Sequence, residues 1–117
     1  MGVTQVWENL RAKARLSEFE IHTVPQNKSI PLWFLVGVSD KHLVIKKAEN
    51  HTPSIKISMD RAITYKDFEF VYRCNERWLK GDHSGRQEAI KKSQNTAYIY
   101  ALIDEASKQK VLEQSKN

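Results

Sequence analysis

The stretch Ile30–Met59, IPLWFLVGVSDKHLVIKKAENHTPSIKISM, decides the fold of this chain. Apolar and polar residues alternate in it over three successive segments, which span residues 32–38, 42–47 and 55–59. The side chains of a β-strand point alternately to its two faces, so this alternation predicts three strands. Turn-forming residues separate the segments, which favours antiparallel pairing between neighbours.

The first of these strands is unusual because it is apolar on both faces. The even-numbered residues of segment 32–38 are apolar and share one face. Trp33 and Leu35 place further apolar side chains on the opposite face, where the flanking strands carry Glu20 and Lys56. A strand of this kind is central and covered twice. Trp33 and Leu35 are therefore our predicted interface residues, covered by a second subunit or another partner, with packing by the first helix as the alternative.

The rest of the chain completes the sheet and its cover. Residues 19–23 alternate as one more strand, and a turn at 25–29 connects it to the next. Apolar side chains recur at helical spacing in residues 4–16 and 64–79, and again in a helix that starts at 93 or 95 and ends near 109. We expect an α+β fold: a four-stranded antiparallel sheet (a meander) with an N-terminal helix and two C-terminal helices packed on it.

Two segments are predicted to lack regular structure. Residues 80–86 contain two glycines and no apolar anchor, which predicts a mobile loop between the C-terminal helices. Residues 110–117 are polar and are predicted to fray. No repeat or linker divides the sequence, so we expect a single domain over residues 1–117.

Composition narrows the class of function. The chain has 117 residues, of which 40% are hydrophobic and 28% charged, as is typical of a globular domain. Its formal charge of +5 favours a polyanionic partner such as nucleic acid. Cys74 is the only cysteine, so we expect no disulfide partner and a reducing, cytoplasmic location. No apolar run approaches the roughly 20 residues of a membrane helix and none resembles a secretory leader, so no membrane partner is expected.

The sequence contains no recognisable catalytic signature. The histidines at 22, 42, 51 and 83 lack the paired spacing of metal ligands, and no base is placed beside Cys74 by the sequence. The acidic-x-Lys pattern of metal-dependent nucleases and the glycine-rich phosphate loop are both missing. We therefore predict no catalytic residue, no metal and no cofactor, and a protein that is not an enzyme.

Basic residues gather between positions 77 and 92, around the predicted loop and the start of the last helix. Loop bases and free helix amides can follow a phosphate backbone, which predicts a basic edge that contacts nucleic acid. The predicted nucleic-acid-binding residues are Lys80, Arg86, Lys91, Lys92 and Asn95. A second excess of bases over residues 41–61 lies beside the sheet, where Trp33 could stack with an unpaired base. The alternative is that these charges only solvate the surface.

Four segments carry a resemblance: WENLRAKA (7–14), WFLVGV (33–38), HLVIKK (42–47) and TAYIYALI (96–103). With this order of segments, the chain from Trp7 to Ile103 resembles small proteins carried on bacterial mobile gene cassettes, the integron-cassette type. It is also similar to small domains found beside nuclease modules in bacterial DNA-defence systems. The resemblance implies a mobile-DNA setting and a nucleic-acid role, and it supplies no catalytic residues because the HNH-type nuclease motif is missing.

Two functions from different classes follow from these patterns. The first is a non-catalytic accessory protein that binds nucleic acid through the basic edge. The second is a protein-interaction or self-assembling module, a dimer in the simplest case, with Trp33 and Leu35 in its interface.

Overall fold

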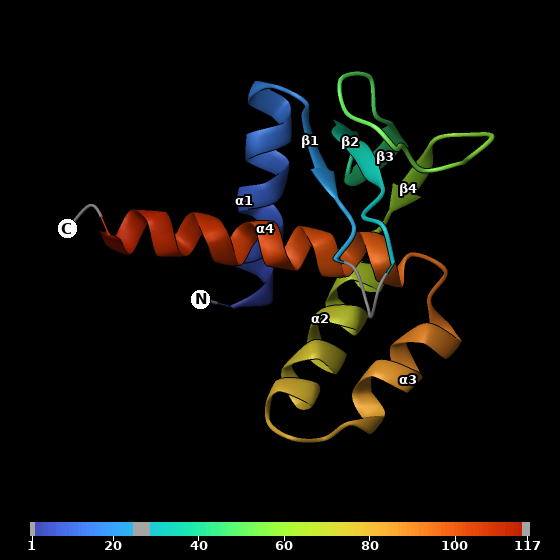
Figure 1. Cartoon of the computed structure of the whole chain (residues 1–117). Helices are drawn as coiled ribbons and strands as arrows, with labels where there is room; N and C mark the ends of the chain where they lie inside the picture. The colour runs from blue at the N-terminus through green and yellow to red at the C-terminus, as the bar shows by residue number, and fades with distance from the viewer. Residues whose placement is uncertain (1, 25–28, 116–117) are drawn as a thin grey trace.

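The computed structural model describes residues 2–24 and 29–115 (Figure 1). Within these residues the chain forms four α-helices and four β-strands. In chain order they are α1 (Val3–Leu16), β1 (Phe19–His22), β2 (Trp33–Ser39), β3 (His42–Lys47), β4 (Arg61–Ile63), α2 (Tyr65–Leu79), α3 (Ser84–Lys92) and α4 (Thr96–Ser115). None of the described helices is both long and apolar enough to cross a membrane.

The strands form one antiparallel sheet in the order β1-β2-β3-β4. This confirms the predicted α+β fold with a four-stranded meander. Leu35 in β2 lies between Glu20 of β1 and Lys46 of β3, and Val44 of β3 pairs with Ala62 of β4. The predicted turn at 25–29 lies mostly outside the described residues. Next to it, the Thr23 N–H donates to the carbonyl oxygen of Leu32 at 2.9 Å, and the Leu32 N–H donates to the Thr23 hydroxyl at 3.0 Å.

The fourth strand is not where the sequence predicts it. We expected residues 55–59, but β4 is formed by Arg61–Ile63. The apolar residues of the predicted strand do not share one face: Ile55 is 4% exposed, Ile57 is half-buried and Met59 is 77% exposed. Their alternation reflects three different surroundings along an irregular connection, and not the two faces of a strand.

One continuous core lies between the sheet and the helices. Phe34 and Val36 of β2 are completely buried and belong to the same cluster as Trp7 of α1, Phe68 of α2 and Leu102 of α4. The predicted start of α2 is also confirmed. Thr64 caps the helix, and its hydroxyl accepts a hydrogen bond from the Asp67 N–H at 3.1 Å.

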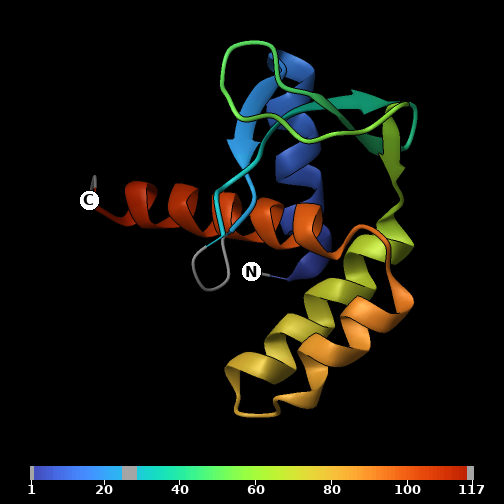
Figure 2. The ribbon, with the colours of Figure 1, turned by 45° about the vertical axis from the view of Figure 1, so that its right-hand side comes forward.

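The predicted mobile loop is partly wrong, because Ser84–Lys92 forms the additional helix α3. Figure 2 shows α2 and α3 running side by side in opposite directions before the chain turns into α4. Gly81 ends α2 with a φ of 100°, as a glycine after a helix often does. Gly85 allows α3 to pack closely against α2. It is buried between the two helices, and a Cβ at this position would overlap the carbonyl oxygen of Cys74.

The last helix is longer than predicted. We expected it to end near residue 109 and the following residues to fray, but α4 continues to Ser115. The sequence from 104 to 115 contains no glycine or proline and is rich in lysine, glutamine and glutamate, which favour helix. Good helix formers therefore extend the helix even without a clear apolar stripe.

Candidate nucleic-acid interface

The structure divides the predicted basic edge into two groups. Lys80 follows the end of α2 and Arg86 lies in the first turn of α3, at the hairpin that joins these helices. Lys91, Lys92 and Asn95 lie at the other end of α3. At a rise of 1.5 Å per residue, the two groups on α3 are separated by about 8–9 Å along the helix axis. The five predicted residues therefore lie at two separate positions on the surface and do not form one continuous patch.

Lys91 and Lys92 project from the last turn of α3. Both are exposed, and Lys92 is 65% exposed although its ammonium lies 3.5 Å from the Glu88 carboxylate. An exposed lysine–glutamate pair at this spacing contributes little stability. Lys92 can therefore exchange this partner for a phosphate at small cost.

The polar residues of the α3–α4 connection hold its shape. Only Ser93, Gln94 and Asn95 join the two helices. The Asn95 side-chain amide donates to Asp67 at 3.0 Å, and its own N–H donates to the Ser93 hydroxyl at 3.1 Å. Thr96 donates its hydroxyl back to the last turn of α3. The Asn95 side chain, which we predicted to contact phosphate, thus hydrogen-bonds to α2 in this structure, and these contacts hold the connection against both helices.

Residues from two other elements, β4 and α2, join the two lysines at this connection. Arg61 of β4 donates from Nη1 to the Gln94 carbonyl oxygen at 3.2 Å, which ties the sheet to the connection. Lys66 is exposed in the first turn of α2, next to the Asp67 that Asn95 binds. We call this surface the basic corner; its members are Arg61, Lys66, Lys91, Lys92 and Gln94. Sequence reasoning missed Arg61 and Lys66 as parts of it because only the tertiary fold brings β4 and the start of α2 to α3.

The first turns of α4 are mostly packed inward behind this corner. Tyr98 packs against Phe34 of the sheet with ring centroids 5.3 Å apart, and Ile99 is completely buried. Of residues 94–101, only Gln94 and Ala97 are exposed, and neither carries a charge. The corner can therefore contact a backbone, but it presents few groups that read base edges.

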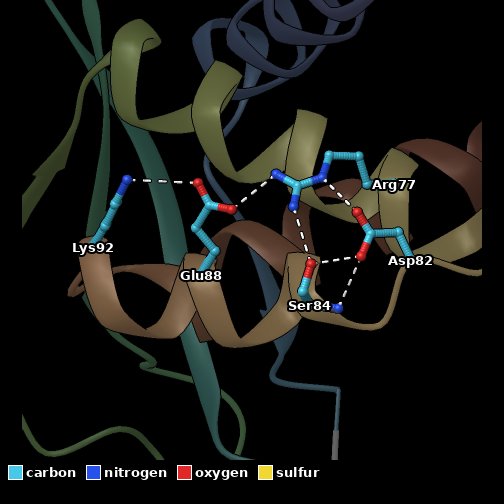
Figure 3. Close-up of polar contacts among 5 residues, drawn as sticks. All are labelled: Arg77, Asp82, Ser84, Glu88 and Lys92. Atoms are coloured by element: carbon cyan, nitrogen blue, oxygen red, sulfur yellow. Dashed lines mark hydrogen bonds and ion pairs between the residues drawn. The ribbon is translucent and has the colours of Figure 1, made fainter.

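Arg77 and its partners stabilise the hairpin between α2 and α3 (Figure 3). Its three guanidinium nitrogens donate to Asp82 at 3.1 Å, to Glu88 at 2.9 Å and to the Ser84 hydroxyl at 3.2 Å. Asp82 in turn accepts from the N–H and the hydroxyl of Ser84. The Ser84 and Arg77 hydrogen bonds lower the pKa of Asp82, and the Arg77 hydrogen bond lowers the pKa of Glu88. The charge of Arg77 is thus neutralised within the chain.

Trp33 and Leu35, the predicted interface residues, lie on the sheet face opposite the helical core. Leu35 is only 8% exposed and does not belong to that core, so the alternative that α1 packs on it is wrong. Residues 48–60, which connect β3 to β4, approach this face. Ile57 and Met59 line a shallow cavity over Leu35, and His51 stacks on Trp33 with ring centroids 3.9 Å apart. The chain itself supplies this cover, and a dimer interface at Trp33 and Leu35 stays a prediction.

A buried carboxylate fixes the connection above Trp33. The Glu20 side chain is 4% exposed and accepts from His51 Nδ1 at 2.7 Å and from the N–H groups of Glu49 and Asn50 at 2.7 and 3.0 Å. Burial raises the pKa of Glu20, but these hydrogen bonds together lower it by more than burial raises it. The pKa of Glu20 therefore lies below its usual value. This contact could not be predicted from local patterns, because Glu20 and His51 belong to separate segments of the sequence.

Neither this cluster nor Cys74 assembles further chemistry. Within the described part of the chain, no three histidine, cysteine, aspartate or glutamate side chains are grouped so as to hold a metal. Cys74 is buried in the core, and burial raises the pKa of its thiol, which keeps it protonated and poorly nucleophilic. The structure thus places Cys74 as a packing residue.

No protein-family model, curated protein or solved structure matches this chain significantly. The resemblance to integron-cassette proteins therefore stays a prediction, and function has to be inferred from the side chains and their surroundings.

Proposed function

We propose that this protein is a non-catalytic accessory that binds nucleic acid through the basic corner. The observation that carries this proposal is the gathering of Arg61, Lys66, Lys91 and Lys92 around the short, hydrogen-bonded α3–α4 connection. Two helices joined by three residues have the connection length of helix-turn-helix units, in which the first helix crosses the phosphate backbone. The corner is built for the same kind of contact.

The corner favours phosphates over bases as its targets. Four of its five side chains are cations, and the α4 residues that would enter a groove are packed against the sheet and α2. Binding of this kind depends on charge and releases counterions from the nucleic acid. It is therefore expected to be weakly selective for sequence, with a dissociation constant of about 1–100 μM that rises steeply with salt.

The proposed setting is mobile DNA, as the resemblance to cassette proteins implies. The overall charge of +5 supports a polyanionic partner in that setting. A non-catalytic, accessory role agrees with the contact between Glu20 and His51. This carboxylate–histidine pair holds the β3–β4 connection in place.

Fluorescence anisotropy with labelled single- and double-stranded DNA tests the proposal at about 50 mM salt and upwards. We expect the double variant Lys91→Gln/Lys92→Gln to weaken binding and to reduce the slope of log affinity against log salt by about 2, since each phosphate contact contributes about 1. The matched control is Arg15→Gln/Lys108→Gln, which removes the same charge from exposed positions on α1 and α4, outside the corner and outside residues 41–61.

Two results would overturn the proposal. The first is the absence of binding by the unmodified protein at the lowest salt concentration. The second is an equal loss of slope in the control double variant, which would mean that net charge alone, and not the corner, attracts the nucleic acid.

A further inference from the structure

Arg86 differs from the other two arginines of the α2–α3 hairpin, Arg73 and Arg77, because no carboxylate among the described residues pairs with it. It lies half-buried in the first turn of α3. Its guanidinium carbon lies 4.1 Å from the ring centroid of Trp78 on α2 and 5.5 Å from that of Tyr100 on α4. Two helices besides its own therefore position this one side chain.

The hydrogen-bonding capacity around Arg86 is incompletely used. Its Nε atom and the hydroxyl of Tyr100 are both buried, and neither has a hydrogen-bond partner in the described part of the chain. The residue as a whole is only half-buried, so part of its side chain remains open to solvent. Stacking on aromatic rings restricts a guanidinium and keeps its planar fork ready for a ligand.

A half-buried cation is costly unless an opposite charge or hydrogen bonds compensate it. The same hairpin shows this compensation at Arg77, where Asp82 and Glu88 supply both. Arg86 has two aromatic rings and the Tyr100 hydroxyl beside it, and no carboxylate among the described residues. We infer that Arg86 is an oxyanion-binding residue, and that its ligand is a backbone phosphate of the nucleic-acid strand that also lies on the basic corner. This inference rests on the proposed function and adds a second contact point to it.

The position of Arg86 along α3 fits this ligand. Lys91 and Lys92 follow it by about 8–9 Å along the helix axis, while phosphates of one DNA strand advance by about 3.4 Å per nucleotide. Along the axis alone this separation corresponds to about two or three nucleotides. Around the axis Lys91 and Lys92 are rotated by about 140° and 240° from Arg86, so a strand that contacts both points has to cross the helix. Ile90, which is 59% exposed, lies between them and offers an apolar surface to a sugar or base. A repeating anion is favoured over an isolated carboxylate because the neighbouring cations lie on the same helix.

A guanidinium can donate two parallel hydrogen bonds to one phosphate, whereas a lysine ammonium acts as a point charge. We therefore compare Arg86→Gln with Arg86→Lys by the anisotropy assay with single-stranded DNA. Arg86→Gln should weaken binding and reduce the salt slope by about 0.7, the share of one single-strand phosphate. Arg86→Lys should keep the slope of the unmodified protein and bind a few-fold more weakly, since one charge remains but the fork is lost.

Arg15→Gln serves as the charge-matched control, because this arginine is exposed on α1 and outside both contact points. Circular dichroism and urea unfolding of every variant are measured to check that the helices remain folded. A purely structural arginine would give lower stability in both Arg86 variants and an unchanged slope, which would overturn the inference.

The assay also separates failure of this inference from failure of the proposed function. If the unmodified protein does not bind, the proposed function is wrong. If it binds, loses slope in Lys91→Gln/Lys92→Gln and keeps slope in Arg86→Gln, only the role of Arg86 is wrong. Competition by polyglutamate that requires Arg86 would instead identify a carboxylate ligand on an acidic protein, and would also overturn the inference.

Discussion

Arg77 and Arg86 lie in one helical hairpin and carry their charges in opposite ways. Arg77 directs all three guanidinium nitrogens at oxygen atoms of the hairpin itself, including the carboxylates of Asp82 and Glu88 (Figure 3). Arg86 faces Trp78 and Tyr100 and has no carboxylate partner among the described residues. The hydrogen-bond donors of Arg77 are thus occupied by groups of the hairpin, whereas Arg86 is held in position by aromatic rings.

The difference indicates which basic residues are available to a partner. An arginine with two carboxylates must lose them before it can bind a phosphate, so its main effect is on the stability of the hairpin. An arginine held by aromatic rings keeps its hydrogen-bonding fork open and costs stability while it is unoccupied. Binding sites often lower the stability of the folded protein in this way. Formal charge read from the sequence does not distinguish the two cases.

The most severe way to break both arrangements is to separate α3 from α2. Gly85→Ala places a Cβ against the carbonyl oxygen of Cys74, which belongs to a helix backbone and cannot move independently. We expect a loss of about 2–3 kcal/mol in the free energy of unfolding, since overpacking outweighs the better helix propensity of alanine. Urea unfolding followed by circular dichroism measures it.

Gln87→Ala is the control for this substitution, because Gln87 is exposed on the same helix and both glutamine and alanine favour helix. It should leave stability nearly unchanged. Equal midpoints for Gly85→Ala and the unmodified protein would mean that α3 can shift away from α2 freely, and that the hairpin does not fix Arg86.

A smaller effect separates the two arginines directly. Arg77→Gln removes the centre of the hydrogen-bonded network and leaves Asp82 and Glu88 without their shared cation, so it should lower the urea midpoint. Arg86→Gln removes a half-buried charge that has no carboxylate partner in the described chain, so it should leave the midpoint unchanged or raise it. Arg73→Gln, which loses only an exposed pair with Glu69, is the control. If Arg86→Gln were the more destabilising of the two, Arg86 would be a structural residue.

Local sequence patterns predicted the parts of this fold that local patterns determine. The strand at 42–47 and the Thr64 cap follow from alternation and from capping chemistry, and the structure confirms both. The helix α3 was missed because glycine and polar residues resemble a loop, while the property that matters at Gly85 is its contact with α2. Long-range packing, and not local propensity, decides that segment.

The candidate site was harder to predict for the same reason. Lys91 and Lys92 could be identified from sequence because charge on a polar segment tends to be exposed. Trp78 and Tyr100 gave no sign of surrounding Arg86, since each belongs to a different helix. Asn95 looked like a free ligand for phosphate but binds Asp67 across the fold. Contacts of this kind have no signature in a single sequence.

Acid titration gives the smallest and most specific test of the Arg77 network. Hydrogen bonding from Arg77 lowers the pKa of Glu88 below its usual value of 4.5. A carboxyl whose pKa is lower in the folded state stabilises the fold above its unfolded-state pKa and loses that contribution as the pH falls through its folded-state pKa. Glu88→Gln should therefore be less stable than the unmodified protein at neutral pH, and the difference should shrink as the pH falls below 4.5.

A double-mutant cycle assigns this titration to its partner. In an Arg77→Gln background, Glu88→Gln should cost less stability and its effect should depend less on pH, because the cation that lowers the pKa of Glu88 is gone. Urea midpoints of the four proteins at neutral and acidic pH provide the measurement. A difference between Glu88→Gln and the unmodified protein that stays constant as the pH falls would show that Glu88 is not coupled to Arg77. The sharp contrast between the neutralised Arg77 and the open Arg86 would then be lost.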